Sequence, residues 1–161
     1  MGGAPGEGMT DGAADDVDAF RHEVRSWLQR SCPESLRGRG GDALDGVWGG
    51  RRWVPEHPDQ KLWLDRCAER GFTAPTWPAE YGGGGLSKAQ AKVLQKEMAR
   101  AQCPPPLIGF GLTMIGPTLL QFGSEAQKRE HLPPICRGAI RWCQGYSEPG
   151  AGSDLASLQT R

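Results

Sequence analysis

The chain has 161 residues and a formal net charge of zero, because 19 Lys and Arg residues balance 19 Asp and Glu residues. Hydrophobic residues make up 37% of it and charged residues 24%, a composition typical of globular proteins that argues against disorder of the whole chain. The balanced charge argues against a nucleic-acid-binding protein, and the sequence has no run of about 18 apolar residues that would span a membrane.

Residues 1–14 are rich in Gly, Ala and acidic side chains, and we expect a disordered tail there. The first sixteen residues carry four acidic groups and no Lys or Arg, unlike a secretory signal peptide. Together with the cysteine pattern described below, this favours a cytoplasmic protein.

A first helix is predicted to begin near Asp15 or Asp16 and to stop at Pro33. Its apolar residues recur at helical spacing along one face: Val17, Phe20, Val24, Trp27 and Leu28. Residues 33–58 are predicted to form a solvated surface loop. An RNA-binding role for the Arg–Gly stretch at 37–41 is disfavoured, because the charges of this loop cancel.

A second helix should follow Pro58 and end at Gly71, with Leu64, Cys67 and Ala68 on its inner face. In the next loop, Trp77 and Tyr81 are expected to pin the chain to the core. The glycine run 82–85 is interpreted as a flexible turn, because no Gly-Lys-Ser/Thr follows it and no strand precedes it as a phosphate loop requires.

Two more helical segments are expected before residue 124. Ser87 is the predicted N-cap of a third helix that ends at Pro104, and Glu97 on that helix is expected to be a solvated or capping charge. The apolar stretch 107–122 is predicted to be a buried helix broken near residues 116–117.

The last helix and a switch to strand periodicity follow. A capping box of Ser124 and Gln127 should open a short helix that closes at residues 133–134, both proline. After Gly138, apolar and polar residues alternate, which predicts a strand near 140–146.

Five cysteines are widely spaced and include no CxxC pair: Cys32, Cys67, Cys103, Cys136 and Cys143. This pattern favours reduced, mostly buried thiols over a disulfide framework or a zinc site. The three histidines lie far apart in the sequence, so no metal ligands are assigned.

The chemistry of the chain is concentrated in residues 144–156. A strand followed by Pro149-Gly150-Ala151-Gly152 could turn through left-handed glycine angles and direct its N–H groups at an anion. Ser147 and Ser153 bracket this turn with hydroxyls. Such an arrangement suits a planar heterocycle along the strand with a phosphate at the turn. On spacing alone, a plain loop is an equal alternative.

Three segments in order resemble the acyl-CoA dehydrogenase family. YSEPGAGSDLA at 146–156 is similar to the family's flavin-binding motif, and PTWPAEYGG at 75–83 and GSEAQK at 123–128 are similar to two upstream segments. The resemblance covers about residue 16 to the end. It implies a mainly α fold: the family's N-terminal helical-bundle domain over 15–138, followed over 139–161 by the first strand and flavin loop of an incomplete β-barrel domain.

The resemblance also implies a function. The chain would be part of a FAD-dependent oxidoreductase that desaturates an acyl-CoA thioester at Cα–Cβ and passes electrons to an electron-transfer carrier, as a homo- or hetero-oligomer. Ser147 would place its hydroxyl by the flavin ring, and Ser153 would reach both the FAD phosphate and the bound acyl-CoA substrate. The full set of implied cofactor-binding residues is Gln144, Gly145, Tyr146, Ser147, Glu148, Pro149, Gly150, Ala151, Gly152 and Ser153.

Parts of the family pattern have no counterpart here. The second flavin-contacting segment is absent, and none of Glu80, Glu97 and Glu148 matches the family's catalytic base, so no catalytic residue is assigned and the chain is expected to be an N-terminal fragment. Glu148 is expected to fix the loop by an ion pair or by backbone hydrogen bonds. Two alternatives stay open: a flavin monooxygenase or acyl-CoA oxidase on the same scaffold, and a non-catalytic helical interaction module or inactive truncated product.

Overall fold

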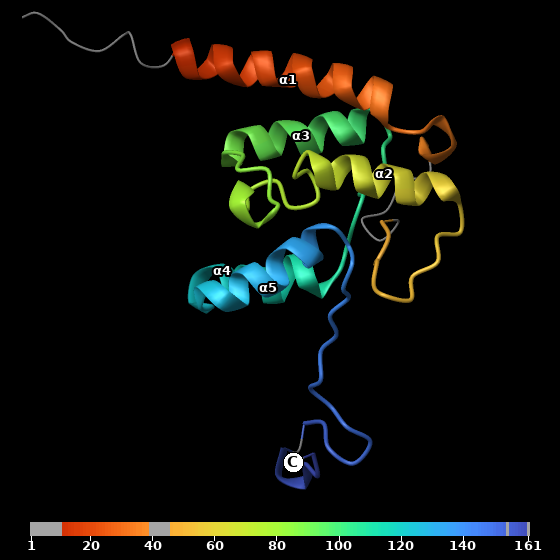
Figure 1. The fold of residues 1–161 in the computed structure, drawn as a ribbon, viewed down its shortest axis with the longest axis vertical. Helices are drawn as coiled ribbons and strands as arrows, with labels where there is room; N and C mark the ends of the chain where they lie inside the picture. The colour runs from red at the N-terminus through yellow and green to blue at the C-terminus, as the bar shows by residue number, and fades with distance from the viewer. Residues whose placement is uncertain (1–10, 39–45, 154, 161) are drawn as a thin grey trace, which may run out of the picture.

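The computed structural model describes residues 11–38, 46–153 and 155–160. Its α-helices are α1 (Asp11–Ser31), α2 (Pro58–Glu69), α3 (Lys88–Arg100), α4 (Gly116–Phe122) and α5 (Glu125–Cys136), with a π-helical turn, η3 (Gly111–Ile115), leading into α4 (Figure 1). Three short 3-10 turns complete the elements: η1 (Glu34–Leu36), η2 (Ala79–Tyr81) and η4 (Leu155–Ser157). The mainly helical fold predicted from the sequence is confirmed. No helix among the described residues is both long and apolar enough to cross a bilayer.

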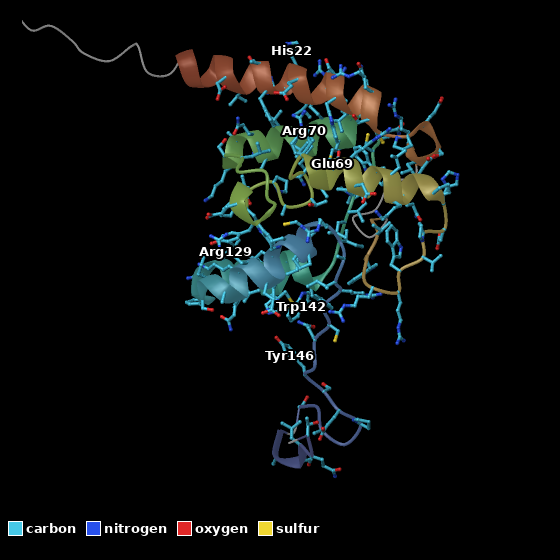
Figure 2. The ribbon with its side chains drawn as sticks, viewed as in Figure 1. His22, Glu69, Arg70, Arg129, Trp142 and Tyr146 are labelled. Carbon is cyan, nitrogen blue, oxygen red and sulfur yellow. The ribbon has the colours of Figure 1, made fainter. Side chains whose placement is uncertain are left out.

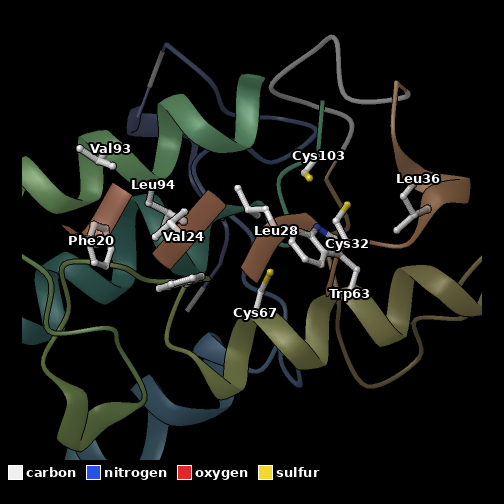
Figure 3. Close-up of a cluster of buried hydrophobic side chains, with 11 residues drawn as sticks. Phe20, Val24, Leu28, Cys32, Leu36, Trp63, Cys67, Val93, Leu94 and Cys103 are labelled. Atoms are coloured by element: carbon white, nitrogen blue, oxygen red, sulfur yellow. The ribbon is translucent and has the colours of Figure 1, made fainter. Parts of the chain in front are cut away.

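Helices α1, α2 and α3 enclose the first hydrophobic core (Figure 3). The predicted face of α1 is confirmed, because Phe20, Val24 and Leu28 are buried and Val17 and Trp27 pack against the same core. The helix begins at Asp11, earlier than Asp15 or Asp16. Ala13 and Ala14, which have the highest helix propensity, extend it by about one turn into the segment expected to be tail.

The N-cap predicted for α3 is confirmed, whereas α2 is capped by His57, which the sequence analysis did not single out. The Ser87 hydroxyl accepts the N–H of Gln90, whose side chain accepts the N–H of Ser87, so α3 begins with a capping box. Trp63 was not expected in the core, yet it is among the most buried side chains. Its indole N–H donates to the carbonyl of Pro104 at 3.0 Å, which satisfies the polar atom that burial takes from water.

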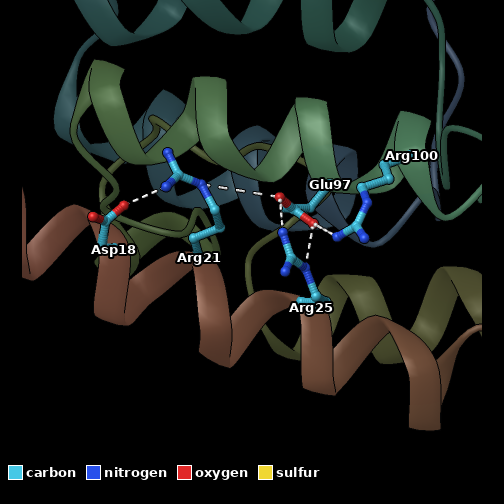
Figure 4. Close-up of polar contacts among 5 residues, drawn as sticks. All are labelled: Asp18, Arg21, Arg25, Glu97 and Arg100. Atoms are coloured by element: carbon cyan, nitrogen blue, oxygen red, sulfur yellow. Dashed lines mark hydrogen bonds and ion pairs between the residues drawn. The ribbon is translucent and has the colours of Figure 1, made fainter.

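Glu97 is the main correction in this half of the molecule. It is buried rather than solvated, with 8% of its side chain exposed. Arg25 of α1 donates two hydrogen bonds to its carboxylate, from Nε at 2.9 Å and Nη2 at 3.0 Å, and Arg21 and Arg100 approach the same group (Figure 4). Arg25 and Arg100 lower the pKa of Glu97, with the Arg25 hydrogen bonds contributing most. The charge on α3 therefore joins α3 to α1.

A second core lies between the 74–81 loop and helices α4 and α5. Trp77 and Tyr81 are buried in it, as predicted, and the Tyr81 hydroxyl donates to the Glu125 carboxylate at 2.8 Å. The glycines that follow are not a flexible turn. A Cβ on Gly83 would lie 2.3 Å from the Trp77 carbonyl oxygen, and Gly83, Gly84 and Gly85 each donate to a carbonyl of residues 74–78. Glycine is needed here because two backbone segments approach closely.

The prolines of α5 do not end it. Pro133 and Pro134 lie inside the helix, which continues to Cys136. Burial of Leu132, Ile135 and Cys136 outweighs the lost backbone hydrogen bonds, a case of tertiary packing overriding local propensity. The predicted capping box of Ser124 and Gln127 is confirmed. The break expected near residues 116–117 takes the form of the η3–α4 change in hydrogen bonding.

Residues 139–160 leave the helical body as an arm (Figure 1). The strand predicted near 140–146 is not formed, because no partner strand pairs with this segment in the described chain. In place of a strand, the described part of the arm contains an isolated antiparallel bridge between Glu148 and Ala151 and the short turn η4.

Candidate functional site

The motif of residues 144–153 lies on the arm, and Gln144 at its start still touches the helical body, because its side-chain N–H donates to the sulfur of Met114 in η3 at 3.1 Å. Trp142 anchors the base of the arm: its ring meets that of His131 of α5 edge to face, at 5.6 Å between centroids. Tyr146, 72% exposed, lies farther out (Figure 2). From residue 143 to residue 153, only Glu148 and Ala151 are not exposed. The predicted cofactor-binding residues thus lie together on the arm, but most of them face solvent and no described residue encloses them from the other side.

A tight turn organises the motif. The N–H of Glu148 donates to the carbonyl of Ala151 at 2.9 Å, and the N–H of Ala151 donates back at 3.0 Å. Pro149 and Gly150 occupy the two positions between them, where proline's fixed φ favours a turn.

Glu148 holds this turn to the end of the arm. Its carboxylate accepts hydrogen bonds from the N–H groups of Gln159 and Thr160 and from the Thr160 hydroxyl. These bonds, above all that of the hydroxyl, lower the pKa of Glu148. The expectation that Glu148 fixes the loop through backbone hydrogen bonds agrees with this geometry. The carboxylate is consequently occupied by the chain itself.

The glycines of the motif differ from the expectation. None of Gly145, Gly150 and Gly152 has a positive φ, so the left-handed angles proposed to converge N–H groups on an anion are absent. A Cβ at Gly145 or Gly150 would meet nothing within 4 Å, and one at Gly152 would meet only the Ser147 hydroxyl, at 3.8 Å. Within the described chain, no contact requires glycine at these three positions.

The two motif serines remain available. Ser147 and Ser153 are both exposed, and no hydrogen bond joins either hydroxyl to the described part of the chain. Each can therefore donate to or accept from a ligand. Together, these two exposed hydroxyls form one face of a polar site. Such a face can orient a flavin or a phosphate but cannot enclose one.

A groove beside the base of the arm was missed by the sequence analysis. It has a volume of about 1080 Å³ and is lined by residues 46–54, Glu56, Gln60, His131 and residues 140–142. Arg51, Arg52 and Arg141 give it positive charge, and the Arg141 guanidinium stacks on Trp48 at 4.5 Å. The tryptophans and arginines of the 33–58 loop were the sequence feature that could have indicated this groove. They follow no regular spacing, so the sequence did not show that they line the groove together with residues 140–142.

Trp142 carries an unsatisfied group at the same place. Its indole nitrogen is buried and has no hydrogen-bond partner among the described residues. The adjacent ring carbon, Cδ1, would lie 3.2 Å from a Cβ on Gly111, so this edge of the indole faces the start of η3. The base of the arm thus packs on the helical domain without satisfying every polar atom.

Comparison with protein families gives one match. The model of the acyl-CoA dehydrogenase N-terminal domain matches residues 14–139, which include all five α-helices except the first residues of α1.

Individual relatives match a larger share of the chain than the family model does. The chain is 44% identical over 145 residues to acyl-CoA dehydrogenase IpdE1 of Mycobacterium tuberculosis, covering 90% of this chain and 36% of that protein. It is 42% identical over 146 residues to acyl-CoA dehydrogenase FadE26 of the same organism, covering 89% and 34%. The chain spans about a third of the length of these curated relatives.

Solved structures agree. A steroid acyl-CoA dehydrogenase, Tcur3481–Tcur3483, superposes with a TM-score of 0.59 at 35% identity, over 91% of this chain and 35% of that one. The ChsE4–ChsE5 complex from Mycobacterium tuberculosis superposes with a TM-score of 0.57 at 30% identity, over 97% and 35%.

Proposed function

Because this chain belongs to the acyl-CoA dehydrogenase family, we propose that it supplies the N-terminal helical domain and one face of the flavin site of an oxidoreductase that desaturates acyl-CoA thioesters. The observation that carries the proposal is the exposed motif. Its three glycines and two serines lack any partner in the described chain, as expected of residues selected for a ligand. FAD, when bound, supplies the electron acceptor for the desaturation.

The residues present fit part of a FAD site. Ser147 and Ser153 would hold the cofactor by hydrogen bonds, and the open space at Gly145 and Gly150 would allow close approach of the ligand to the backbone. Glu148 would act indirectly, by keeping the turn in shape through its bonds to residues 159 and 160. Ser153 is also proposed to contact the acyl-CoA substrate.

This chain should retain FAD weakly when it is alone. Each neutral hydrogen bond contributes only about 0.5–1.5 kcal/mol, and ordering the arm costs about 1–2 kcal/mol per residue fixed. These terms nearly cancel for two serines and a few N–H groups. The rest of the site, including the base that removes the Cα proton, is proposed to correspond to parts of the relatives outside the span matched here.

A chimera tests the proposal. Residues 1–161 of this chain would replace the matching part of the 44% identical relative, and flavin absorbance and dye reduction with acyl-CoA would be measured after gel filtration. We expect a yellow, active chimera, in which Ser153→Ala weakens both FAD retention and turnover. Ser26→Ala, on the exposed face of α1, is the matched control. A folded chimera that binds no FAD, or one in which both serine variants behave alike, would contradict the proposed site.

Partner and substrate follow from the same relatives. One of them carries the double name Tcur3481–Tcur3483 and the other is a ChsE4–ChsE5 complex, and these names support our proposal that this domain works within an oligomer. We also propose that it passes electrons to an electron-transfer carrier. One relative is named a steroid acyl-CoA dehydrogenase, which makes steroid acyl-CoA thioesters the first substrates to test beside straight-chain ones. A chimera that yields hydrogen peroxide without a carrier would instead favour the oxidase alternative.

A further inference from the structure

The groove at the base of the arm lies outside the proposed flavin site, which is farther along the arm. Its walls come from the loop 46–54, which precedes α2, and from residues 140–142. Its volume of about 1080 Å³ matches the larger small-molecule pockets of proteins. The chain therefore forms a second place where a small organic molecule fits.

Backbone contacts join the two walls of the groove. The N–H of Gly50 donates to the carbonyl of Gly138 at 2.8 Å. Gly49 has a φ of +61°, and a Cβ there would lie 2.4 Å from the Gly138 carbonyl oxygen, so glycine is needed for the approach. A Cβ on Gly50 would lie 3.1 Å from the Cβ of Arg141, on the opposite wall. These contacts fix the loop against the base of the arm, so the groove is formed before any ligand binds.

The groove carries an excess of positive charge. Three arginines, Arg51, Arg52 and Arg141, line it against a single carboxylate, that of Glu56. All four residues are exposed, and none of them forms an ion pair with a described residue. This balance favours a ligand with more than one negative charge. The planar guanidinium fork suits phosphate oxygens, which it binds in pairs.

Three tryptophans line the same groove: Trp48, Trp53 and Trp142. The Arg141 guanidinium stacks on Trp48 at 4.5 Å, and His131 meets Trp142 edge to face. Trp53 is only half-buried, and no ring or guanidinium among the described residues packs on it. Its indole is therefore available to stack on a planar ligand, as aromatic side chains beside arginines do with nucleic acid bases.

We propose that this groove binds a nucleoside phosphate, with the base on Trp53 and the phosphate oxygens on Arg51, Arg52 and Arg141. Inorganic phosphate would use the arginines and leave most of the volume empty, and an acidic peptide would use the charges without the planar ring. A nucleoside phosphate uses both features. The proposal goes beyond the proposed flavin function and does not rest on it. A free nucleotide and the nucleotide end of coenzyme A share this chemistry.

Equilibrium dialysis of the whole chain against radiolabelled ADP tests the proposal. We expect saturable binding that weakens as salt increases, because the arginines are exposed. Unlabelled ADP should displace the label at least about tenfold better than pyrophosphate or adenosine, since each lacks one half of the contacts. CoA is compared with ADP as a competitor, and the tighter of the two identifies the source of the nucleotide. No saturable binding, or equal competition by pyrophosphate or by a glutamate-rich peptide, would overturn the proposal.

Variants of the groove assign the contacts. Arg51→Ala and Arg52→Ala remove exposed side chains, so the fold should be kept while each weakens ADP binding about tenfold, as expected for a lost charge-assisted hydrogen bond. Trp53→Leu should weaken the binding of ADP and leave that of pyrophosphate unchanged. Arg30→Ala, exposed in the last turn of α1, is the matched control. Equal effects of Arg30→Ala and Arg52→Ala would contradict a site in the groove.

The flavin motif needs a control of its own, because FAD itself contains a nucleoside diphosphate. A chain that carries both Ser147→Ala and Ser153→Ala should bind ADP as the parent does. Loss of ADP binding in that chain, with binding retained in Arg52→Ala, would place the nucleotide on the motif and overturn the assignment to the groove. The comparison therefore separates failure of this proposal from failure of the proposed flavin site.

Discussion

The buried carboxylate of Glu97 offers a sharp test of what holds α1 to α3. Glu97→Gln keeps the shape of the side chain but removes the charge that faces Arg21, Arg25 and Arg100. In the variant, the guanidiniums of Arg25 and Arg100 would lie near each other without the negative charge of Glu97 between them. We expect α1 to dock less firmly on α3, since no ion pair other than those of Glu97 joins these two helices among the described residues.

The magnitude follows from the geometry. A hydrogen bond to a charged group contributes about 1.5–3 kcal/mol, and breaking a fully buried ion pair costs about 3–5 kcal/mol. Arg25 is 36% exposed, so water can solvate it in the variant and the loss should stay toward the lower figures. We expect about 2–3 kcal/mol, which is a fall in Tm of about 4–12 °C for a chain of this size.

The pH dependence gives a second, independent check. Because the folded pKa of Glu97 lies below its ordinary value, its contribution is fully present above the unfolded pKa and is lost as pH falls through the folded pKa. The stability difference between parent and variant should therefore be full at about pH 7 and narrow below about pH 4.

Thermal unfolding followed by circular dichroism between these pH values measures both quantities. Glu69→Gln is the matched control, because Glu69 is exposed at the end of α2 and has no ion pair with the described residues. Equal losses in the two variants, or a Glu97→Gln difference that stays constant down to acid pH, would refute the assigned role of the ion-pair cluster.

Three further outcomes can be measured on the same chain. Trp27→Ala should cost about 3 kcal/mol in urea unfolding, because the ring packs on Trp63 at 5.5 Å and on Phe72 at 5.1 Å but is only half-buried; an unchanged midpoint would mean that this face of α1 is misassigned. Gly83→Ala should lower Tm strongly, since its Cβ would lie 2.3 Å from the Trp77 carbonyl oxygen, whereas Gly150→Ala should change stability by no more than about 0.5 kcal/mol; similar effects at both positions would argue against the close approach. Chain incubated with excess FAD and gel-filtered should elute nearly colourless, and a stoichiometric yellow protein would show that the motif face alone suffices.

Local patterns predicted the helices well where a cap and an apolar face agreed. Ser87 was predicted as an N-cap and Ser124 with Gln127 as a capping box, and both helices begin at these serines, each with a capping box. The α1 face followed from the spacing of Phe20, Val24 and Leu28. These features depend on residues close in sequence, which a single sequence displays.

Features that depend on residues far apart in the sequence were harder to predict. Glu97 looked solvated because Arg25, its partner, lies 72 positions away. Pro133 and Pro134 looked like a helix end because the burial that outweighs them comes from the second core. The strand near 140–146 needed a neighbour that the described chain does not provide. The motif residues were found by their resemblance to a family, whereas the groove at Arg51 and Arg141 arises only when the loop folds against the arm.

The division of the domain into two hydrophobic cores bears on how it opens. The core under α1 and the core under α5 draw on different side chains, and the tightly bonded glycine segment 82–85 connects Tyr81 of the second core to Leu86, which packs on the first. Such a layout favours separate cooperative units in native-state hydrogen exchange, each with its own free energy of opening. Amides of α5 and of α1 should then exchange with different denaturant dependence. The half that carries the arm could in that way adjust to a cofactor while the α1–α3 half stays closed.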